Sequence, residues 1–335
     1  MFGRKRGSFD CSAKKECDTI CRATTQGGIQ MKSIPNQQTH TPPDGFAQAA
    51  SLCGFGALVY WAVSMLVSEL LNWVLAQNSM QAWQSNAVAM LALQVGGNLL
   101  SLLVPFFLLF AQPLTAKQLY MQKARKGTLQ AAFLVFWVLV MAGNAAAMLL
   151  GKWLHQSHEQ VVLPQEMGLL LTMWVGLAVV PALAEELLFR GLLQGYLRRY
   201  GAWISIVGQA VVFALLHGEA PSCLAALFGG IALGICAEMT QSLWCSMLFH
   251  LYNNTMAFAA QYYSQYGGES SLQRVLQFSI PAVVLLGYLV ERVKHTKQKP
   301  LRFAKDTPIF MLAKSLGWCV CVVILVCKMV LETVA

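Results

Sequence analysis

Long apolar runs constrain this chain more than any other feature of its sequence. A stretch of roughly 17–25 apolar residues crosses the hydrocarbon core of a bilayer as a helix. Only 12% of the residues are charged and 56% are hydrophobic, which is too apolar for a water-soluble domain. The runs predict an all-α, polytopic transmembrane helical bundle of eight or nine spans, at 53–76, 88–112, 129–150, 167–189, 203–217, 222–238, 242–264, 277–290 and 309–330.

The distribution of Lys and Arg predicts how these spans are oriented, because cytoplasmic loops carry an excess of both. With the N-terminus in the cytoplasm, the outside loops hold only Lys152 and Arg274. The inside segments hold seven in 1–50, four in 113–128, three in 190–202 and six in 291–308. The formal net charge of +9 then reflects orientation and attraction to anionic membrane lipids, and we expect no nucleic-acid partner. An integral, multi-pass protein follows, and a bacterial cell membrane is favoured over the endoplasmic reticulum.

A few polar residues inside the apolar spans need a separate explanation. Ionisable groups in a span are costly and usually face a cavity or a partner. Glu69 and Glu238 lie near span ends, where we expect them to reach water. What remains is a set of charged, imidazole and amide side chains: Glu185, Glu186, Arg190, His217, His250 and Asn254.

Helical spacing assigns different positions to the two adjacent glutamates. Residues four apart share one helix face, so Glu186 and Arg190 can pair. Glu185 is rotated by about 100° from Glu186 and stays available for another role. Pro181 predicts a kink one turn earlier, which opens space near the site.

Two later helices add further polar side chains to this set. The sequence FALLH predicts Phe213 and His217 on one face of a helix, and HLYNN predicts the same for His250 and Asn254. A lone histidine on an apolar helix is usually a satisfied buried group, but two of them with an in-phase Asn are harder to explain that way. Gly230 is expected, together with Gly234, to let the helix over 222–238 pack closely against a neighbour.

One carboxylate, two imidazoles and one carboxamide suit hydrolysis. A carboxylate in a poorly hydrated pocket can accept a proton from water, with a histidine to orient that water. A second histidine and an Asn can donate hydrogen bonds to a developing oxyanion. The same residue types also form a catalytic zinc site, with water as the fourth ligand. The residues alone leave the choice between zinc and a metal-free reaction open.

Three short motifs resemble those of a known family. EELLFR at 185–190, FALLH at 213–217 and HLYNN at 250–254 are similar, in order and spacing, to the EExxxR, FxxxH and HxxxN/D motifs of the CAAX-protease and bacteriocin-processing (CPBP, or Abi) family. SLWCSMLFH at 242–250 resembles the segment that leads into the third motif. The likeness covers roughly 165–260, and this family of intramembrane proteases includes the type II CAAX prenyl endopeptidase.

The resemblance implies a role for each matched residue. Glu185 would be the catalytic carboxylate, His217 would help it to activate water, and His250 and Asn254 would hold the oxyanion. The predicted spans place His217 at the opposite end of its helix, so the alternative is that helix 167–189 continues through GLLQGYLRRY, the next helix begins later and His217 lies deeper. Supporting roles would belong to Glu186, Arg190 and Phe213. A zinc ion, if the reaction uses one, would be bound by Glu185, His217 and His250, whereas a metal-free glutamate mechanism needs none.

The chain then divides into four regions. We expect a disordered basic cytoplasmic tail in 1–50, N-terminal transmembrane helices in 51–164, the catalytic helices in 165–260 and C-terminal transmembrane helices in 261–335. The predicted function is an intramembrane endopeptidase that cleaves a membrane-embedded, lipidated or precursor peptide. The alternative is a non-catalytic immunity or scaffold protein of the same fold.

Overall fold

The computed structural model describes most of the chain from Gly45 onwards. The described residues are 45–76, 96–97, 99–100, 114–115, 117–124, 128–155, 162–266, 271–294 and 307–334. The predicted tail up to residue 44 and nearly all of the predicted span 88–112 lie outside them. The helices described below belong to the unit formed by 42–335.

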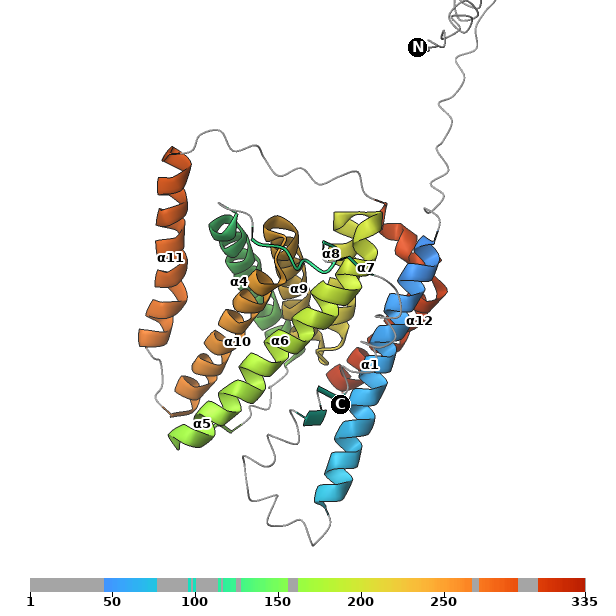
Figure 1. The fold of residues 1–335 in the computed structure, drawn as a ribbon. Coiled ribbons are helices and arrows are strands. Elements are labelled where there is room, and N and C mark those ends of the chain that lie inside the picture. The colour runs from blue at the N-terminus through green and yellow to red at the C-terminus, as the bar shows by residue number, and fades with distance from the viewer. Residues whose placement is uncertain are drawn as a thin grey trace, which may run out of the picture. The chain divides into compact units, whose positions relative to one another are not determined.

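The described residues form helices, and no strand occurs among them (Figure 1). The helices are α1 (Phe46–Leu75), α4 (Leu129–Leu154), α5 (Met167–Trp174), η3 (Val175–Val179), α6 (Val180–Glu186), η4 (Leu187–Gln194), α7 (Gly195–Leu197), η5 (Arg198–Tyr200), α8 (Ala202–Leu215), α9 (Ala220–Thr240), α10 (Leu243–Tyr266), α11 (Ser271–Lys294), η6 (Ile309–Lys314) and α12 (Leu316–Val334).

Several of these helices are suited to cross a bilayer. Five have the required length and hydropathy: Phe46–Leu70, Leu129–Leu154, Met167–Tyr200, Ala220–Thr240 and Leu316–Val334. Ala202–Leu215 and Gln277–Val290 are shorter apolar segments. The predicted all-α membrane bundle is therefore confirmed. Helix α1 begins at Phe46, inside the segment predicted as a tail, because the Phe46 side chain is buried and contacts the Tyr200 ring edge-on at 5.1 Å.

The most consequential difference from the predicted spans is the length of the fourth one. The apolar run predicts it at 167–189 with a cytoplasmic loop after it, whereas the alternative has it continue through GLLQGYLRRY. The alternative is confirmed, because helical structure continues without a break from Met167 to Tyr200. Gly201 then reverses the chain with φ 139°, a conformation that favours glycine, and α8 starts at the next residue. Glu185 lies 16 residues before Gly201 and His217 lies 16 residues after it, so this hairpin brings both to a similar depth.

Two π-helical segments flank the pair of glutamates in this long helix. The segment η3 ends at Val179, two residues before Pro181, and η4 follows Glu186. Proline has no backbone N–H to donate, and a wider turn just before it accommodates that loss. Such π segments inside α-helices are frequent at functional sites. Where the sequence predicts a kink at Pro181, the structure has π-helical turns on both sides of α6.

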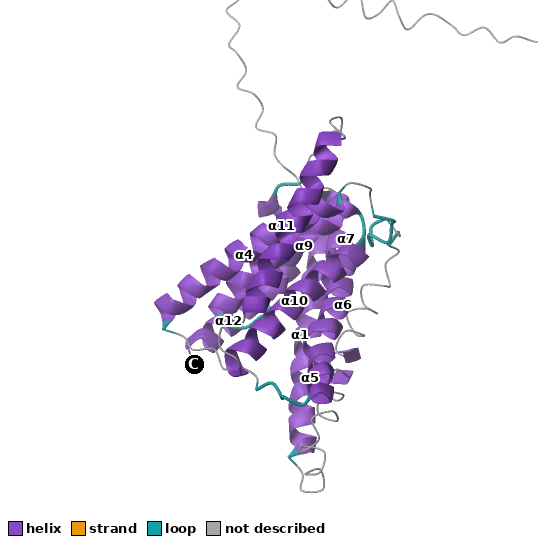
Figure 2. Ribbon diagram, turned by 90° about the vertical axis from the view of Figure 1, so that its left-hand side faces the viewer, coloured by secondary structure: helices purple, strands orange, loops and turns teal. Residues whose placement is uncertain are grey.

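Helix α9 packs against α4, α8 and α10 (Figures 1 and 2). Two glycines allow the close approach that the sequence predicts. A Cβ atom built on Gly230 would lie 3.0 Å from the Ala210 Cβ of α8, and one on Gly234 would lie 2.8 Å from Gln209 Nε2. The two backbone carbonyl groups instead accept hydrogen bonds from buried side chains, Gly230 O from Gln209 and Gly234 O from Gln194.

Glu238 does not reach water as the sequence predicts. Its side chain is buried, and its carboxylate binds Arg198 through Nε at 2.9 Å and Nη2 at 3.0 Å. The hydroxyl of Tyr120, a fully buried residue before α4, donates a 2.6 Å hydrogen bond to Glu238 and accepts one from Gln194. Burial, together with the nearby Glu238 carboxylate, raises the pKa of Tyr120 well above its usual value. This network fixes the segment at 117–121 against the ends of η4 and α9.

Candidate active site

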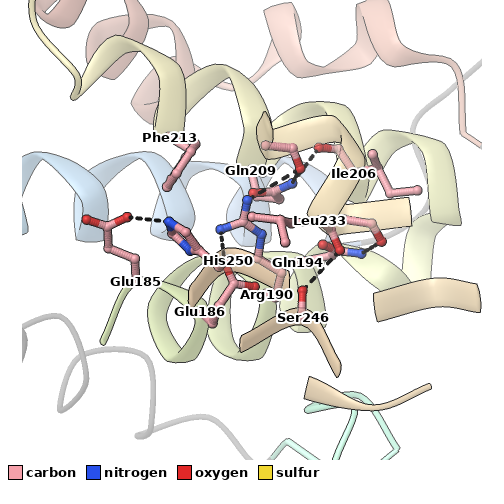
Figure 3. A network of polar contacts seen from close by, with 12 residues as sticks. Glu185, Glu186, Arg190, Gln194, Ile206, Gln209, Phe213, Leu233, Ser246 and His250 are labelled. Carbon is pink, nitrogen blue, oxygen red and sulfur yellow. Dashed lines mark hydrogen bonds and ion pairs between the residues drawn. The ribbon is translucent and has the colours of Figure 1, made fainter. Parts of the chain in front are cut away.

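A fully buried ion pair forms the base of the candidate site (Figure 3). Arg190 Nη1 donates to Glu186 Oε1 at 2.6 Å, and neither side chain is exposed to solvent. The guanidinium group also lies 4.5 Å from the centre of the Phe213 ring and contacts Gly230 O at 3.5 Å. The pair predicted from the i, i+4 spacing therefore forms, inside the bundle rather than at a solvated helix end.

His250 of α10 lies between the two glutamates. Its Nδ1 atom is 2.9 Å from Glu186 Oε1, and its Nε2 atom is 3.8 Å from Glu185 Oε2. Because Glu186 is an acceptor, this contact fixes the proton on Nδ1 and turns Nε2 toward Glu185. Glu186 thus orients His250 as well as Arg190.

Glu185 has more freedom than its neighbour. Its side chain is 23% exposed, whereas that of Glu186 is completely buried. It lines a pocket of about 260 Å³, and its position on the helix leaves it unpaired with Arg190, as the spacing predicts. The available carboxylate of the pair is therefore the one that faces the pocket.

His217 reaches the same pocket by a route that the sequence did not predict. Helix α8 ends at Leu215, so His217 lies in the following turn and not on the helix face shared with Phe213. Its ring still packs on Phe213, with centroids 4.5 Å apart, and its Nδ1 atom is 2.7 Å from Phe213 O. Because the carbonyl oxygen can only accept, the proton lies on Nδ1 and Nε2 keeps a lone pair.

Phe213 is the common contact of the two histidines. Its ring meets that of His250 edge-on at 6.1 Å and that of Phe189 edge-on at 5.0 Å. Asn254 lies one turn beyond His250 on α10, and its Nδ2 atom donates a long hydrogen bond of 3.5 Å to Ala178 O in η3. The structure thus joins Glu185, Glu186 and His250 directly and brings His217 to the pocket that Glu185 lines. Asn254 is placed against the preceding part of the long helix.

The pocket itself also draws on helices outside the three motifs. Besides Glu185 and His217, the pocket is lined by Phe189, Phe213 and Leu216. Helix α12 contributes Lys328, and α1 contributes Tyr60, Trp61, Ser64 and Met65. The sequence motifs identified none of the α1 and α12 contributors. Only Lys328, as an ionisable residue within a span, carried a signal that could have identified it.

Three polar residues behind the site were also missed. Gln194, Gln209 and Ser246 are fully buried, and each donates to a backbone carbonyl group: Gly234 O, Gly230 O and Leu233 O respectively. They lie one or more turns along the helices that carry the motif residues. For Gln194 and Ser246, the available signal was a spacing of four residues from Arg190 and His250.

The donor arrangement does not fit a metal ion. Among the described residues, no three His, Cys, Asp or Glu side chains lie close enough to hold one. The resemblance implies three ligands: Glu185, His217 and His250. Of these, His250 Nε2 and Glu185 Oε2 lie 3.8 Å apart, and a catalytic zinc ion needs a third protein ligand beside such a pair. The reaction proposed for this site therefore assigns no step to a metal. The seven described cysteines are free thiols.

Comparison with known proteins identifies this part of the chain. A family model described as type II CAAX prenyl endopeptidase, Rce1-like, matches residues 167–256, which include all three motifs. A comparison with curated proteins and one with solved structures each gave no match. The helices that carry the candidate site are thus those that the family model covers. Within this multi-pass membrane protein, residues 167–256 match the model of the Rce1-like, type II CAAX prenyl endopeptidase family.

Proposed function

We propose that the protein is an intramembrane endopeptidase that hydrolyses a peptide bond in a membrane-embedded or lipidated substrate. The observation that carries this proposal is the division between the two adjacent glutamates. Glu186 is buried and bound by Arg190 and His250, whereas Glu185 faces a pocket with His217. A purely structural ion pair would not require the second carboxylate or either histidine.

Glu185 acts as the general base in this proposal. Its carboxylate takes a proton from a water molecule, and the free Nε2 atom of His217 accepts that molecule's other hydrogen and so orients it. The water oxygen then bonds to the carbonyl carbon of the scissile peptide, and the carbonyl oxygen becomes an oxyanion. Glu185 finally returns its proton to the leaving amine, which completes the hydrolysis without a covalent intermediate.

His250 and Asn254 stabilise the oxyanion. Asn254 donates through Nδ2, and His250 donates through Nε2 once it carries a second proton. Removing a single donor of this kind typically lowers kcat by about 10²–10³-fold. Arg190 and Phe213 hold Glu186 and the two imidazole rings in place.

Cleavage of a reporter pool tests this function. The full chain, purified in detergent, is incubated with lipidated and single-span reporter peptides, and products are identified by mass spectrometry. We expect cleavage by the wild type and none by Glu185→Gln. Lys152→Met, a change of an exposed residue at the end of α4, serves as the matched control and should cleave like the wild type.

A chelator added to the same assay examines the role of a metal. The metal-free mechanism predicts equal rates with and without the chelator, and loss of activity that added zinc restores would contradict it. Cleavage that survives Glu185→Gln would refute the role of Glu185. A wild type that binds peptides from the pool without cleaving any of them would favour a non-catalytic immunity or scaffold protein.

A further inference from the structure

The wall of the pocket opposite the motif residues comes from α1 and α12, which both lie outside the segment matched by the family model. The two helices are held together by a close backbone approach: a Cβ atom built on Gly54 would lie 2.6 Å from Gly317 O. Ser51 Oγ and Ser315 Oγ are also 2.9 Å apart. Helices α1 and α12 therefore form one fixed wall of the site.

Lys328 is the charged residue that this wall contributes to the pocket. A lysine near the end of a span usually extends its ammonium group to the membrane surface, away from protein. The side chain of Lys328 is instead only 11% exposed and turns toward the pocket. An ionisable group that faces a cavity inside a span marks a functional position by default.

The Lys328 ammonium group lies beside the turn that carries His217. A Cβ atom built on Gly218 would lie 3.9 Å from Lys328 Nζ, and Gly218 has a φ of 87° that favours glycine. One turn further along α12, Thr333 Oγ1 accepts a 2.9 Å hydrogen bond from Ala220 N at the start of α9. These contacts fix the position of Lys328 relative to His217.

The present partner of Lys328 is easy to replace. Lys328 Nζ donates to Glu332 Oε2 at 2.7 Å, but the Glu332 side chain is 43% exposed. An ion pair with such an exposed member contributes only about 0–1 kcal/mol to stability, so Glu332 can share or release the cation when another anion enters the pocket. The indole Nε1 of Trp61, also on the pocket wall, has no hydrogen-bond partner among the described residues.

We propose that Lys328 binds a carboxylate of the peptide substrate and so determines specificity for the reaction at Glu185. This inference rests on the endopeptidase function proposed above. Because one pocket of about 260 Å³ holds both Glu185 and Lys328, the carboxylate lies within a few residues of the scissile bond. An extended peptide covers about 3.3–3.6 Å per residue, so two or three residues bridge the pocket.

Two sources can supply such a carboxylate: the C-terminus of a short leaving segment, or an Asp or Glu side chain. The experiment uses reporter peptides that the wild type cleaves, after the cleaved bond has been located by mass spectrometry. Each peptide is made with a free C-terminal carboxylate and with a C-terminal amide. A third, amidated form carries Glu at one of the three positions after the cleaved bond.

We expect the wild type to cleave a carboxylate-bearing form with kcat/KM about tenfold or more above the plain amide, mainly through KM, since hydrogen bonds to charged groups are the stronger ones. A preference for the free acid assigns the C-terminus, and a preference for the Glu form assigns a side chain. Lys328→Met should abolish the preference by slowing the favoured peptide much more than the plain amide. Lys328→Arg should retain it.

Glu332→Gln separates recognition from a purely structural role of the ion pair. It should keep the preference, because the substrate contacts Lys328. The proposal is overturned if the wild type does not distinguish the three peptide forms, if Lys328→Met keeps the wild-type ratio, or if Glu332→Gln removes it. Equal slowing of all forms by Lys328→Met also overturns it. Absence of any cleavage that depends on Glu185 instead refutes the endopeptidase function, and the two failures are thereby distinguished.

Discussion

The Glu186–Arg190 pair offers the sharpest test of how the site is held. In Glu186→Leu the Arg190 guanidinium stays fully buried without its 2.6 Å partner, and Arg190→Met leaves the Glu186 carboxylate in the same position. Breaking a buried pair by removing one member costs roughly 3–5 kcal/mol. Since total stabilities are about 5–15 kcal/mol, each single variant should lose a large part of its free energy of unfolding.

The double variant Glu186→Leu/Arg190→Met removes both charges and keeps similar side-chain volumes. Its main remaining defect is the His250 Nδ1–H group, which loses its acceptor at 2.9 Å and should cost about 1–3 kcal/mol. The double variant is therefore expected to be more stable than either single one. Glu332→Gln weakens a pair of the same i, i+4 spacing whose carboxylate is 43% exposed, and it should cost about 1 kcal/mol or less.

Unfolding in mixed micelles, followed by tryptophan fluorescence as the denaturing detergent increases, measures all four variants against the wild type. Single variants that lose less than about 1 kcal/mol, as an exposed pair would, refute a buried pair that holds the site. A loss in the double variant that equals the sum of the two single losses also refutes it, because the charges would then not be coupled.

Three further predictions concern the packing and polar groups around the site. Gly230→Ala should destabilise the protein by about 1–3 kcal/mol, because its Cβ would meet Ala210 Cβ at 3.0 Å. Gly229→Ala is the control: nothing lies within 4 Å of a Cβ built there, and the same unfolding assay should show no loss or a gain of up to about 1 kcal/mol. Tyr120→Phe leaves Glu238 without a 2.6 Å donor and should destabilise the protein by about 1–3 kcal/mol. An unchanged midpoint of unfolding would contradict a stabilising role of this hydrogen bond. The N-cap carboxylate of Glu166 accepts from the N–H groups of Leu169 and Gly168, which lowers its pKa below the usual value of 4.5. The stability that this carboxylate provides is present above pH 4.5 and is lost as the pH falls through the lowered pKa. The free energy of unfolding of Glu166→Gln should therefore fall less than that of the wild type when the same unfolding assay is repeated at acid pH.

The sequence predicted where helices occur better than it predicted the residues at which they end. Apolar runs located each of the long described helices, because a membrane span leaves little choice of backbone structure. The apolar run ended the fourth helix at 189, because Arg198 looks like part of a charged loop, and only the depth that the motifs require of His217 predicted the continuation to Tyr200. In the fold its charge is satisfied by Glu238, a residue 40 positions away, together with the Tyr120 ring at 4.4 Å. Such a partner cannot be identified from local composition.

The same limit applies to the site. The i, i+4 spacing predicted the Glu186–Arg190 pair, because that contact is made within one helix. The same spacing wrongly placed His217 on the helix of Phe213, which ends two residues before His217. The contact of His250 with both glutamates and the contribution of Lys328 depend on how separate helices pack. A single sequence carries no direct signal for such contacts.

The central claim is that Glu185, and not its buried neighbour, performs the chemistry. The most direct test compares Glu185→Gln with the wild type in two measurements. One is kcat on a single cleaved reporter peptide at equal concentrations of folded protein, and the other is the free energy of unfolding. Glu185 is partly exposed, and its contact with His250 is 3.8 Å, so the substitution should leave stability within about 0.5 kcal/mol. We expect kcat to fall by about 10²-fold or more. A variant that stays folded and cleaves within about tenfold of the wild-type rate would contradict the assignment of Glu185.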